Sequence, residues 1–287
     1  MKRVAIVVPL SSRPRLTPDE RVSLRHLVHF LGHYDKYVVA PASLPVDFPG
    51  FGVHRFADHF FGSVAAHARL LFSDRFYATF ADYEYILLYH LDALVFSDQL
   101  LAWCDRGYDM IGAPWFTVLP STGIAPSGPA YGEISTGAGN GGFALRRVRA
   151  FREVLNSRRL GIDPKEFFDT MTAGMPAAMR LALLPLRWSK HIRAFNCASW
   201  EGRRHWSDCE DLFYAHRGPQ YAPGFSVAPV AEALRFSFEV KPRVCFELNG
   251  NQLPFGCHAW PRYDRAFWEP FLLPETVGAP AHAAAGA

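Results

Sequence analysis

Continuous apolar runs alternate with helical apolar patterns along the first third of the chain. Residues 4–8 are a β-branched run that ends at Pro9, and residues 37–40 form a second run that ends at Pro41. Between them Leu24, Leu27, Val28 and Leu31 recur at the spacing of one helical face. A strand, a helix and a strand at this distance predict a βαβ unit with parallel strands and a right-handed crossover.

The same patterns extend over most of the remaining chain. Thr17, Pro18 and Glu20 have the spacing of a capping box at the start of the first helix. We predict strands at 52–56, 85–91, 108–112 and 141–145, and helices at 63–72, 74–81, 99–106, from 146 to about 156, and about 166–184. Residues 117–139 are rich in Gly, Pro, Ser and Thr and are predicted to form a long loop. The expected fold class is α/β, a Rossmann-type α/β/α sandwich with a mostly parallel central sheet.

Polar residues follow two of the predicted strands. The run at 85–91 is the strongest strand signal and leads directly into Asp92. Ligands of open α/β sheets bind beyond the carboxyl ends of the strands. We therefore expect Asp92 at a binding site, and Pro9 and Ser11, just past the first strand, where a nucleobase would lie.

Composition indicates an ordinary globular protein. The chain has 287 residues, of which 49% are hydrophobic and 20% charged, and no clear linker or internal repeat divides it. We expect one domain over 1–275 and a disordered Ala/Gly-rich tail at 276–287. No stretch approaches the roughly 20 apolar residues that span a bilayer. The five cysteines show no disulfide or zinc spacing, which favours a reducing cytoplasm.

Charge narrows the class of partner only slightly. A formal net charge of +3 gives no reason to expect nucleic acid. Arg accounts for 25 of the 30 basic residues, which suits phosphate ligands or reflects codon usage. Six Arg within 146–159 predict a solvated helix face, with an acidic partner or a membrane surface as the alternative. We expect a cytoplasmic protein and leave peripheral membrane association at the inner face open.

Several blocks stand out when the chain is taken in order: Phe61-Gly62-Ser63, Arg69-Leu70-Leu71, Phe76-Tyr77, Tyr83-Glu84-Tyr85-Ile86-Leu87, Leu91-Asp92-Ala93-Leu94-Val95-Phe96, Trp103-Cys104, Tyr108-Asp109-Met110-Ile111-Gly112-Ala113-Pro114-Trp115, Gly139-Asn140-Gly141-Gly142-Phe143-Ala144-Leu145-Arg146, Glu210-Asp211-Leu212-Phe213, Phe236-Ser237-Phe238-Glu239 and Pro254-Phe255-Gly256-Cys257-His258. Their order and wording resemble an uncharacterised bacterial domain family associated with capsule and surface polysaccharide loci. The resemblance covers roughly residues 4–270 and implies a GT-A-like fold. It also implies transfer of a sugar from a UDP- or GDP-sugar to a hydroxyl on a glycan, a lipid-linked sugar or a small molecule.

The resemblance implies a divalent metal beside Asp92. GT-A enzymes place Asp-x-Asp at the end of a central strand, where the carboxylates hold Mn²⁺ or Mg²⁺ against the nucleotide diphosphate. Here Leu94 occupies the third position. His90, two residues before Asp92 on the predicted strand, points to the same face and is a substitute ligand. His258 matches a late histidine that returns to the metal in related enzymes. A ribose-binding or capping role for Asp92 and a packing role for His258 are the alternatives.

The acidic pair Glu210 and Asp211 resembles the catalytic carboxylates of inverting GT-A enzymes. Asp211 would remove the proton of the acceptor hydroxyl, and Glu210 would bind the acceptor or the sugar. A helix N-terminus that favours acids is the alternative explanation. A retaining transferase needs no such base, and a degenerate transferase would act as a glycan-binding protein. A nucleotidyltransferase is less consistent, because no Gly-rich loop follows the first strand.

The remaining candidates are assigned to donor or sugar binding. Gly141 and Gly142 leave room for a ligand, and Asn140 could bond sugar hydroxyls, although a plain turn explains all three. Trp115 would stack on a sugar face or pack in the core. Arg69 resembles an Arg that reaches the nucleotide in related transferases, with a structural salt bridge as the alternative.

Overall fold

A six-stranded sheet forms the centre of the protein. The computed structural model describes residues 1–13, 15–116, 134–188 and 190–275. The strand order is β3-β2-β1-β4-β9-β6; the first four are parallel, β9 runs antiparallel to β4, and β6 runs antiparallel to β9. Their bounds are β1 Lys2–Pro9, β2 Asp35–Pro41, β3 Gly52–Phe56, β4 Tyr83–Tyr89, β6 Met110–Ile111 and β9 Phe143–Arg147.

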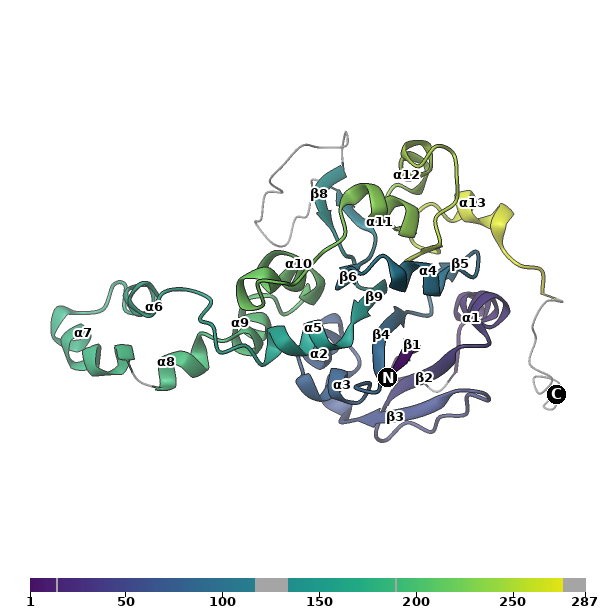
Figure 1. Ribbon diagram of the computed structural model, residues 1–287. Helices are drawn as coiled ribbons and strands as arrows, with labels where there is room; N and C mark the ends of the chain where they lie inside the picture. Colours follow the sequence, from purple (N-terminus) through teal and green to yellow (C-terminus); the bar gives the residue numbers. More distant parts are fainter. Residues whose placement is uncertain (14, 117–133, 189, 276–287) are drawn as a thin grey trace.

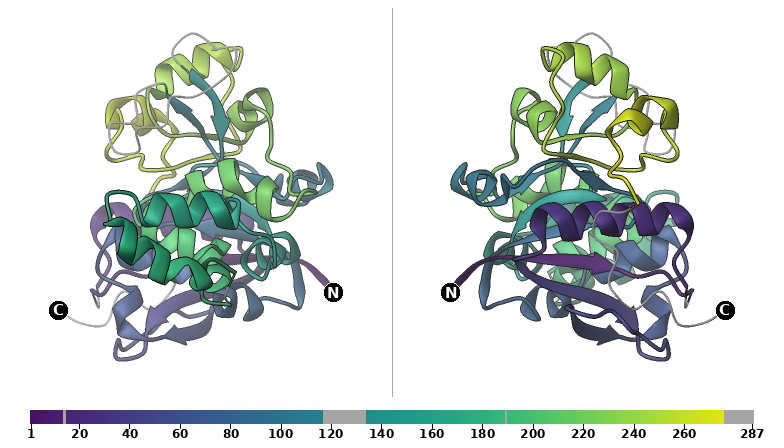
Figure 2. Two further views of the ribbon diagram at one scale, coloured as in Figure 1. Left: turned by 90° about the vertical axis from the view of Figure 1, so that its left-hand side faces the viewer. Right: turned by 90° about the vertical axis from the view of Figure 1, so that its right-hand side faces the viewer.

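Helices cover both faces of this sheet, which confirms the predicted α/β/α arrangement (Figure 1). Because side chains alternate along β1, Val4, Ile6 and Val8 pack with the helices of one face, and Ala5 and Val7 with those of the other. The first face is covered by α1 (Pro18–Leu31), which crosses the sheet in the right-hand view of Figure 2, and by α4 (Leu100–Asp105). The other is covered by α2 (Val64–Leu71), α3 (Asp74–Ala78), α5 (Val148–Leu155) and α10 (Glu210–Tyr221).

The predicted start of α1 is confirmed in detail. The Glu20 backbone N–H donates to the Thr17 hydroxyl at 3.2 Å, and the Thr17 N–H donates to the Glu20 carboxylate at 2.6 Å. This reciprocal capping box satisfies two of the donors that a helix N-terminus leaves without partners. It fixes the point at which the chain turns from the end of β1 into the helix.

Two smaller sheets stand beside the central one. β5 (Leu94–Val95), β10 (Ser237–Phe238) and β11 (Gly256–Cys257) form one, and β7 (Pro114–Phe116) and β8 (Ile134–Ala138) form the other. Within the described ranges, no helix combines the length and the apolar character that crossing a membrane requires. The other elements are η1 Asp58–Phe60, α9 Ala198–His205, α11 Val230–Phe236, α12 Pro242–Leu248, α13 Arg265–Trp268 and η3 Glu269–Phe271.

Three predicted elements were wrong in extent or type. The region assigned to a loop, 117–139, contains β8, which its turn-rich composition did not indicate. Residues 117–133 and the predicted tail at 276–287 lie outside the described residues. The helix predicted at about 166–184 is two helices, α6 (Pro164–Met171) and α7 (Ala177–Leu183), separated by Gly174 at φ +81° and by Pro176. The strand at 85–91 ends at Tyr89.

A helical arm projects from the body of the protein. It consists of α6, α7, η2 (Leu184–Trp188) and α8 (Lys190–Phe195) and extends to the left in Figure 1. In the left-hand view of Figure 2 the arm faces the viewer. Its helices pack against one another, and α8 also packs against α9, which leads back into the body. We refer to residues 164–195 as the α6–α8 arm.

Candidate functional site

A polar cleft of about 800 Å³ lies beyond the carboxyl ends of β1 and β4. Asp92 and Asp211 both line it, so the two carboxylates that sequence analysis assigned to chemistry share one cavity. Pro9, Ser11 and Asn140 line it as well. The other polar and glycine residues of the wall are Ser12, Arg13, Thr17, Asp19, Glu20, Gly62, Ser63, His67, His90, Gly141, Gly142, Asp208, Glu210 and His258.

The three-stranded sheet of β5, β10 and β11 brings residues from three parts of the chain to the edge of the cleft. β11 pairs antiparallel with β5 through Cys257 and Leu94, and parallel with β10 through Cys257 and Phe238. The next residue after each of these strands is therefore placed in the same row, His258 after β11 and Glu239 after β10. Asp92 precedes β5, and its carbonyl accepts a hydrogen bond from the Trp260 N–H at 3.1 Å.

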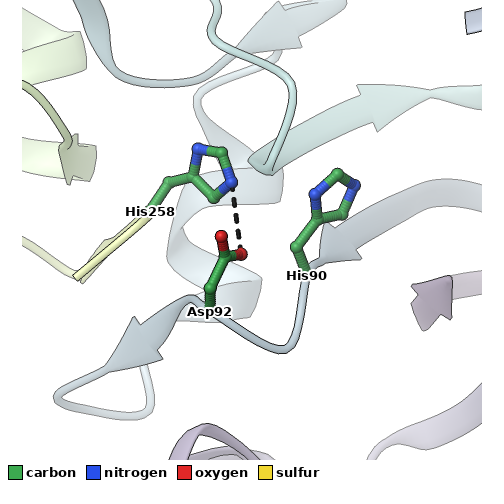
Figure 3. Close-up of side chains that lie close together, drawn as sticks. All are labelled: His90, Asp92 and His258. Atoms are coloured by element: carbon green, nitrogen blue, oxygen red, sulfur yellow. Dashed lines mark ion pairs between the residues drawn. The ribbon is translucent and has the colours of Figure 1, made fainter. Parts of the chain in front are cut away.

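His90, Asp92 and His258 form a compact cluster (Figure 3). One ligand-type atom from each lies within 4.8 Å of the others. His258 Nε2 lies 3.3 Å from Asp92 Oδ1, and His258 Nδ1 lies 2.9 Å from Glu239 Oε1. On the other side, His90 Nε2 is 3.2 Å from His67 Nε2. The predicted ligand set is thus brought together.

The three side chains have strongly perturbed pKa values. Burial would lower the pKa of His258, but the carboxylates of Glu239 and Asp92 outweigh it and raise the pKa to about 10. Burial would raise the pKa of Asp92, but the hydrogen bond from His258 lowers it to about 2. The pKa of His90 lies well below its usual value because of burial first and of His67 and His258 next. At pH 7 His90 is therefore neutral and Asp92 ionised, as metal ligands must be, whereas His258 is protonated and would have to release that proton to bind a cation.

The donor set fits a divalent transition metal. Two imidazoles and one carboxylate on one side of a cleft suit Mn²⁺ better than Mg²⁺, which prefers oxygen ligands. The contact between His258 Nδ1 and Glu239 has the form of the carboxylate that orients a metal-bound histidine. The sequence argument that placed His90 and Asp92 on one strand face was wrong, because both lie beyond the end of β4. A turn, with the Ala93 N–H bonded to the His90 carbonyl at 2.9 Å, brings them together instead.

The acidic pair occupies the N-terminus of α10, as predicted. Asp211 accepts hydrogen bonds from the backbone N–H of Gly141 at 3.1 Å and of Leu212 at 2.8 Å. Burial and then the charge of Glu210 raise the pKa of Asp211 to about 7, although Arg146 opposes this. A carboxylate with a pKa near the working pH is suited to accept and release a proton.

Arg146 is a component of the site that sequence analysis misplaced. It was grouped with the solvated Arg-rich face, but the structure buries its side chain completely. The β9 strand extends to Arg147, so Arg146 points inward from the sheet rather than outward from a helix. Its guanidinium donates to Glu210 at 2.8 Å and to the Tyr77 hydroxyl at 2.9 Å. Arg146 therefore fixes Glu210, whose side chain is only 10% exposed.

Asn140, Gly141 and Gly142 connect the histidine cluster to the acidic pair. A Cβ on Gly142 would lie 1.9 Å from His258 Nε2, and one on Gly141 would lie 2.8 Å from Glu210 Oε1. The carbonyl of Gly142 also accepts the His90 N–H at 2.9 Å. Glycine is required here because the side chains of the site itself occupy the space where a Cβ would stand.

Two predicted binding residues lie elsewhere. Arg69 donates to the His59 carbonyl at 3.1 Å and is not among the described residues that line the cleft. Trp115 is buried, with 6% of its surface exposed, and stacks on His216 with a ring-centroid distance of 6.0 Å. In the described part of the chain, Trp115 does not reach the cleft either. Trp115 therefore packs in the core, which was its alternative role, whereas Arg69 bonds a backbone carbonyl and forms no salt bridge with the described residues.

Three further residues of the site received no role from sequence analysis. His67 contacts His90, Glu239 contacts His258, and Arg146 holds Glu210. Glu239 and Arg146 each gave a signal, since each ends one of the blocks that carry the family resemblance. His67 sits on α2, far from the other ligands in sequence, and no local pattern distinguishes it from a core histidine.

Substituting Arg146 by Met tests whether this buried pair supports the site. Removing one partner leaves Glu210 as an uncompensated buried charge, so we expect a loss of about 3–5 kcal/mol in the free energy of unfolding. Chemical denaturation would measure it. Arg149, whose side chain is 85% exposed on α5, is the matched control, and its substitution by Met should stay within about 0.5 kcal/mol. Equal small losses in both variants would contradict a structural role for Arg146.

The fold and the cleft together define an α/β protein with a His/Asp/His cluster and an acidic pair at the carboxyl edge of its sheet. A family model matches residues 50–258, and the chain belongs to that family, described as proteins of unknown function (DUF5672). The chain has no significant match among curated proteins.

Comparison with solved structures gives only distant likenesses. The glycosyltransferase GlyE of Streptococcus pneumoniae TIGR4 is 12% identical with a TM-score of 0.43, over 96% of this chain and 62% of GlyE. A glycosyltransferase involved in the glycosylation of the major capsid of PBCV-1 is 13% identical with a TM-score of 0.42, over 93% of this chain and 98% of that protein. A197 from STIV is 14% identical with a TM-score of 0.30, over 55% of this chain and 71% of A197. This chain spans less than two thirds of the length of GlyE.

Proposed function

We propose that this protein is a metal-dependent glycosyltransferase of the GT-A type. It would move a sugar from a nucleoside-diphosphate sugar to a hydroxyl acceptor with inversion of configuration. One observation carries the proposal: a single cleft holds a divalent-metal ligand set and a separate carboxylate, Asp211, whose pKa is raised to about 7. Transfer with inversion needs a base for the acceptor, and a divalent cation would stabilise the leaving diphosphate.

The charges of the cleft support a metal-bound donor. Among the described lining residues, Arg13 is the only Lys or Arg side chain, and it is paired with Glu20 at 2.9 Å. Six carboxylates line the same cavity: Asp19, Glu20, Asp92, Asp208, Glu210 and Asp211. A bare diphosphate would find no unpaired Lys or Arg side chain among the described lining residues, whereas a diphosphate bound to a divalent cation is largely neutralised.

A side cavity suits the nucleoside. It has a volume of about 310 Å³ and shares Leu10, Ser11 and Arg13 with the main cleft. Leu44, Val46 and Phe48 give it apolar walls, and Asp47 gives it a carboxylate. An aromatic base between apolar side chains and a ribose hydroxyl on a carboxylate would fit this lining. Ser11 keeps its predicted role in this proposal, whereas Pro9 lines the main cleft and not the side cavity.

Each side chain of the cleft then has a defined task. His90, Asp92 and His258 would hold the cation, with Glu239 and His67 orienting the two imidazoles. When bound, the cation neutralises charge on the departing diphosphate. Asp211 accepts the proton of the acceptor hydroxyl, and the Gly141 and Leu212 N–H groups hold its carboxylate in place. Glu210, fixed by Arg146, raises the basicity of Asp211.

A panel of nucleotide sugars tests the proposal. We expect one UDP- or GDP-sugar, with Mn²⁺ present, to raise the melting temperature by several degrees at about 100 times its Kd, because a ligand of the native state stabilises by about 2.7 kcal/mol there. The same donor should release nucleotide slowly in the presence of Mn²⁺. Binding of a glycan with no nucleotide release from any donor would instead favour the glycan-binding alternative and refute the transferase.

A further inference from the structure

The α6–α8 arm exposes an unusual number of large apolar side chains. Of the 13 exposed large hydrophobic residues in the described part of the chain, seven lie between positions 171 and 195. Leu181 is 68% exposed and Met179 55%, and α7, which carries both, has no buried residue. The others are Met171, Met175, Leu184, Leu186 and Phe195. A soluble surface rarely gathers apolar side chains in this way unless they meet a partner.

The same segment is basic. The arm, residues 164–195, carries Lys165, Arg180, Arg187, Lys190 and Arg193 against Glu166 and Asp169, and its residues 170–195 contain no Asp or Glu. Asp169 is already paired with Lys165 and Arg180. Lys190 and Arg193 are exposed and form no ion pair with the described residues. The arm therefore presents positive charge and apolar side chains together.

We propose that the α6–α8 arm docks on an anionic lipid bilayer. Methionine and leucine side chains would enter the boundary between headgroups and acyl chains, while Lys190 and Arg193 would contact the phosphate groups. Charge favours lipid over a second copy of the chain, because two such arms would bring like charges together. The chain continues from the arm through α9 to Asp208 and the acidic pair, which line the cleft.

Vesicle binding tests the proposal without donor or acceptor, so its outcome is independent of transferase activity. The purified full chain is floated with vesicles of phosphatidylcholine alone or with about 30% phosphatidylglycerol, a fraction chosen to give a strongly anionic surface. We expect binding only to the anionic vesicles, weakened by high salt. Lys190→Glu/Arg193→Glu should reduce affinity at least about tenfold, since each basic residue near such a surface contributes roughly fivefold. Met179→Asp/Leu181→Asp should reduce binding that persists in high salt.

Matched variants on other surfaces serve as controls. Leu101 and Leu248 are 45% and 44% exposed outside the arm, and Arg149 lies on the Arg-rich face of α5. Leu101→Asp, Leu248→Asp and Arg149→Glu should bind vesicles as the parent does, with unchanged melting temperatures in all variants. Absence of vesicle binding, or equal loss in the controls, would overturn the proposal. A dimer in solution that the Met179→Asp/Leu181→Asp variant dissociates, without vesicle binding, would assign the arm to self-association instead.

Discussion

Replacing Asp211 by Asn is expected to abolish sugar transfer while donor binding persists. The amide keeps the size of the side chain but cannot accept the proton of the acceptor hydroxyl, so we expect kcat to fall by about 10²- to 10⁴-fold. The thermal shift caused by the donor with Mn²⁺ should remain, because Asp211 is not part of the metal cluster. Asp105→Asn is the control, since that carboxylate is 71% exposed and pairs with Arg3 on the surface.

The pH profile gives the same prediction an independent test. Because burial and Glu210 raise the pKa of Asp211 to about 7, and Arg146 opposes them, the base is half ionised near neutrality. The rate should rise with pH up to about 7 and then level. In the Asp211→Asn variant the residual rate should no longer rise with pH over this range. A retaining transferase would keep substantial turnover in the variant, and that outcome would contradict the inverting assignment.

Stability distinguishes lost chemistry from lost folding. An acid whose pKa is higher in the native state than its unfolded value of about 3.9 binds its proton more tightly when folded. Asp211 therefore contributes stability at low pH that is lost as pH rises through about 7. Asn does not titrate, so at pH 8 the variant should melt at or above the temperature of the parent. A lower melting temperature would show that Asp211 is needed for packing.

The fold could be predicted because its signals are local. The β-branched run at the start of β1, the capping box of α1 and the apolar run of β4 each depend on neighbouring residues. Because the apolar run of β4 leads directly into Asp92, the position of Asp92 at the cleft could also be predicted. The α6–α8 arm could not be predicted, because its apolar residues follow a helical pattern like that of a buried helix. Only the structure shows that nothing in the described chain covers them.

The site was predicted in part, for a related reason. Asp92, His258 and Asp211 stood out through their place in the order of blocks. Arg146 did not. The predicted strand ended at residue 145, which placed Arg146 on an exposed helix, whereas β9 continues to Arg147 and turns the Arg146 side chain inward. Arg69 was placed by resemblance and Trp115 by its capacity to stack on a sugar, and their side chains contact other parts of the fold instead. Residue type alone does not distinguish a ligand-binding Arg from a structural one.

Asp92→Asn should remove the divalent cation and with it the activity. Asp92 is the only carboxylate in the cluster of His90, Asp92 and His258 found among the described residues, so the amide leaves two neutral imidazoles to hold the metal. Loss of an outer-shell partner typically costs 10- to 100-fold in metal affinity, and loss of a ligand should cost at least about 100-fold. Free Mn²⁺ measured by electron paramagnetic resonance reports this without any substrate. Asp98→Asn, on an exposed carboxylate paired with His33, is the matched control.

Metal exchange on the parent protein completes this test. Chelation should abolish transfer, and Mn²⁺ should restore it better than Mg²⁺, because imidazole is a poor ligand for the harder ion. The Asp92→Asn variant should remain inactive at Mn²⁺ concentrations that saturate the parent and Asp98→Asn. An unchanged Mn²⁺ affinity in the Asp92→Asn variant would show that this cluster does not hold the cation. The diphosphate would then face a cleft whose only described Lys or Arg side chain, Arg13, is already paired with Glu20, and a nucleotide-sugar donor could no longer be assigned to it.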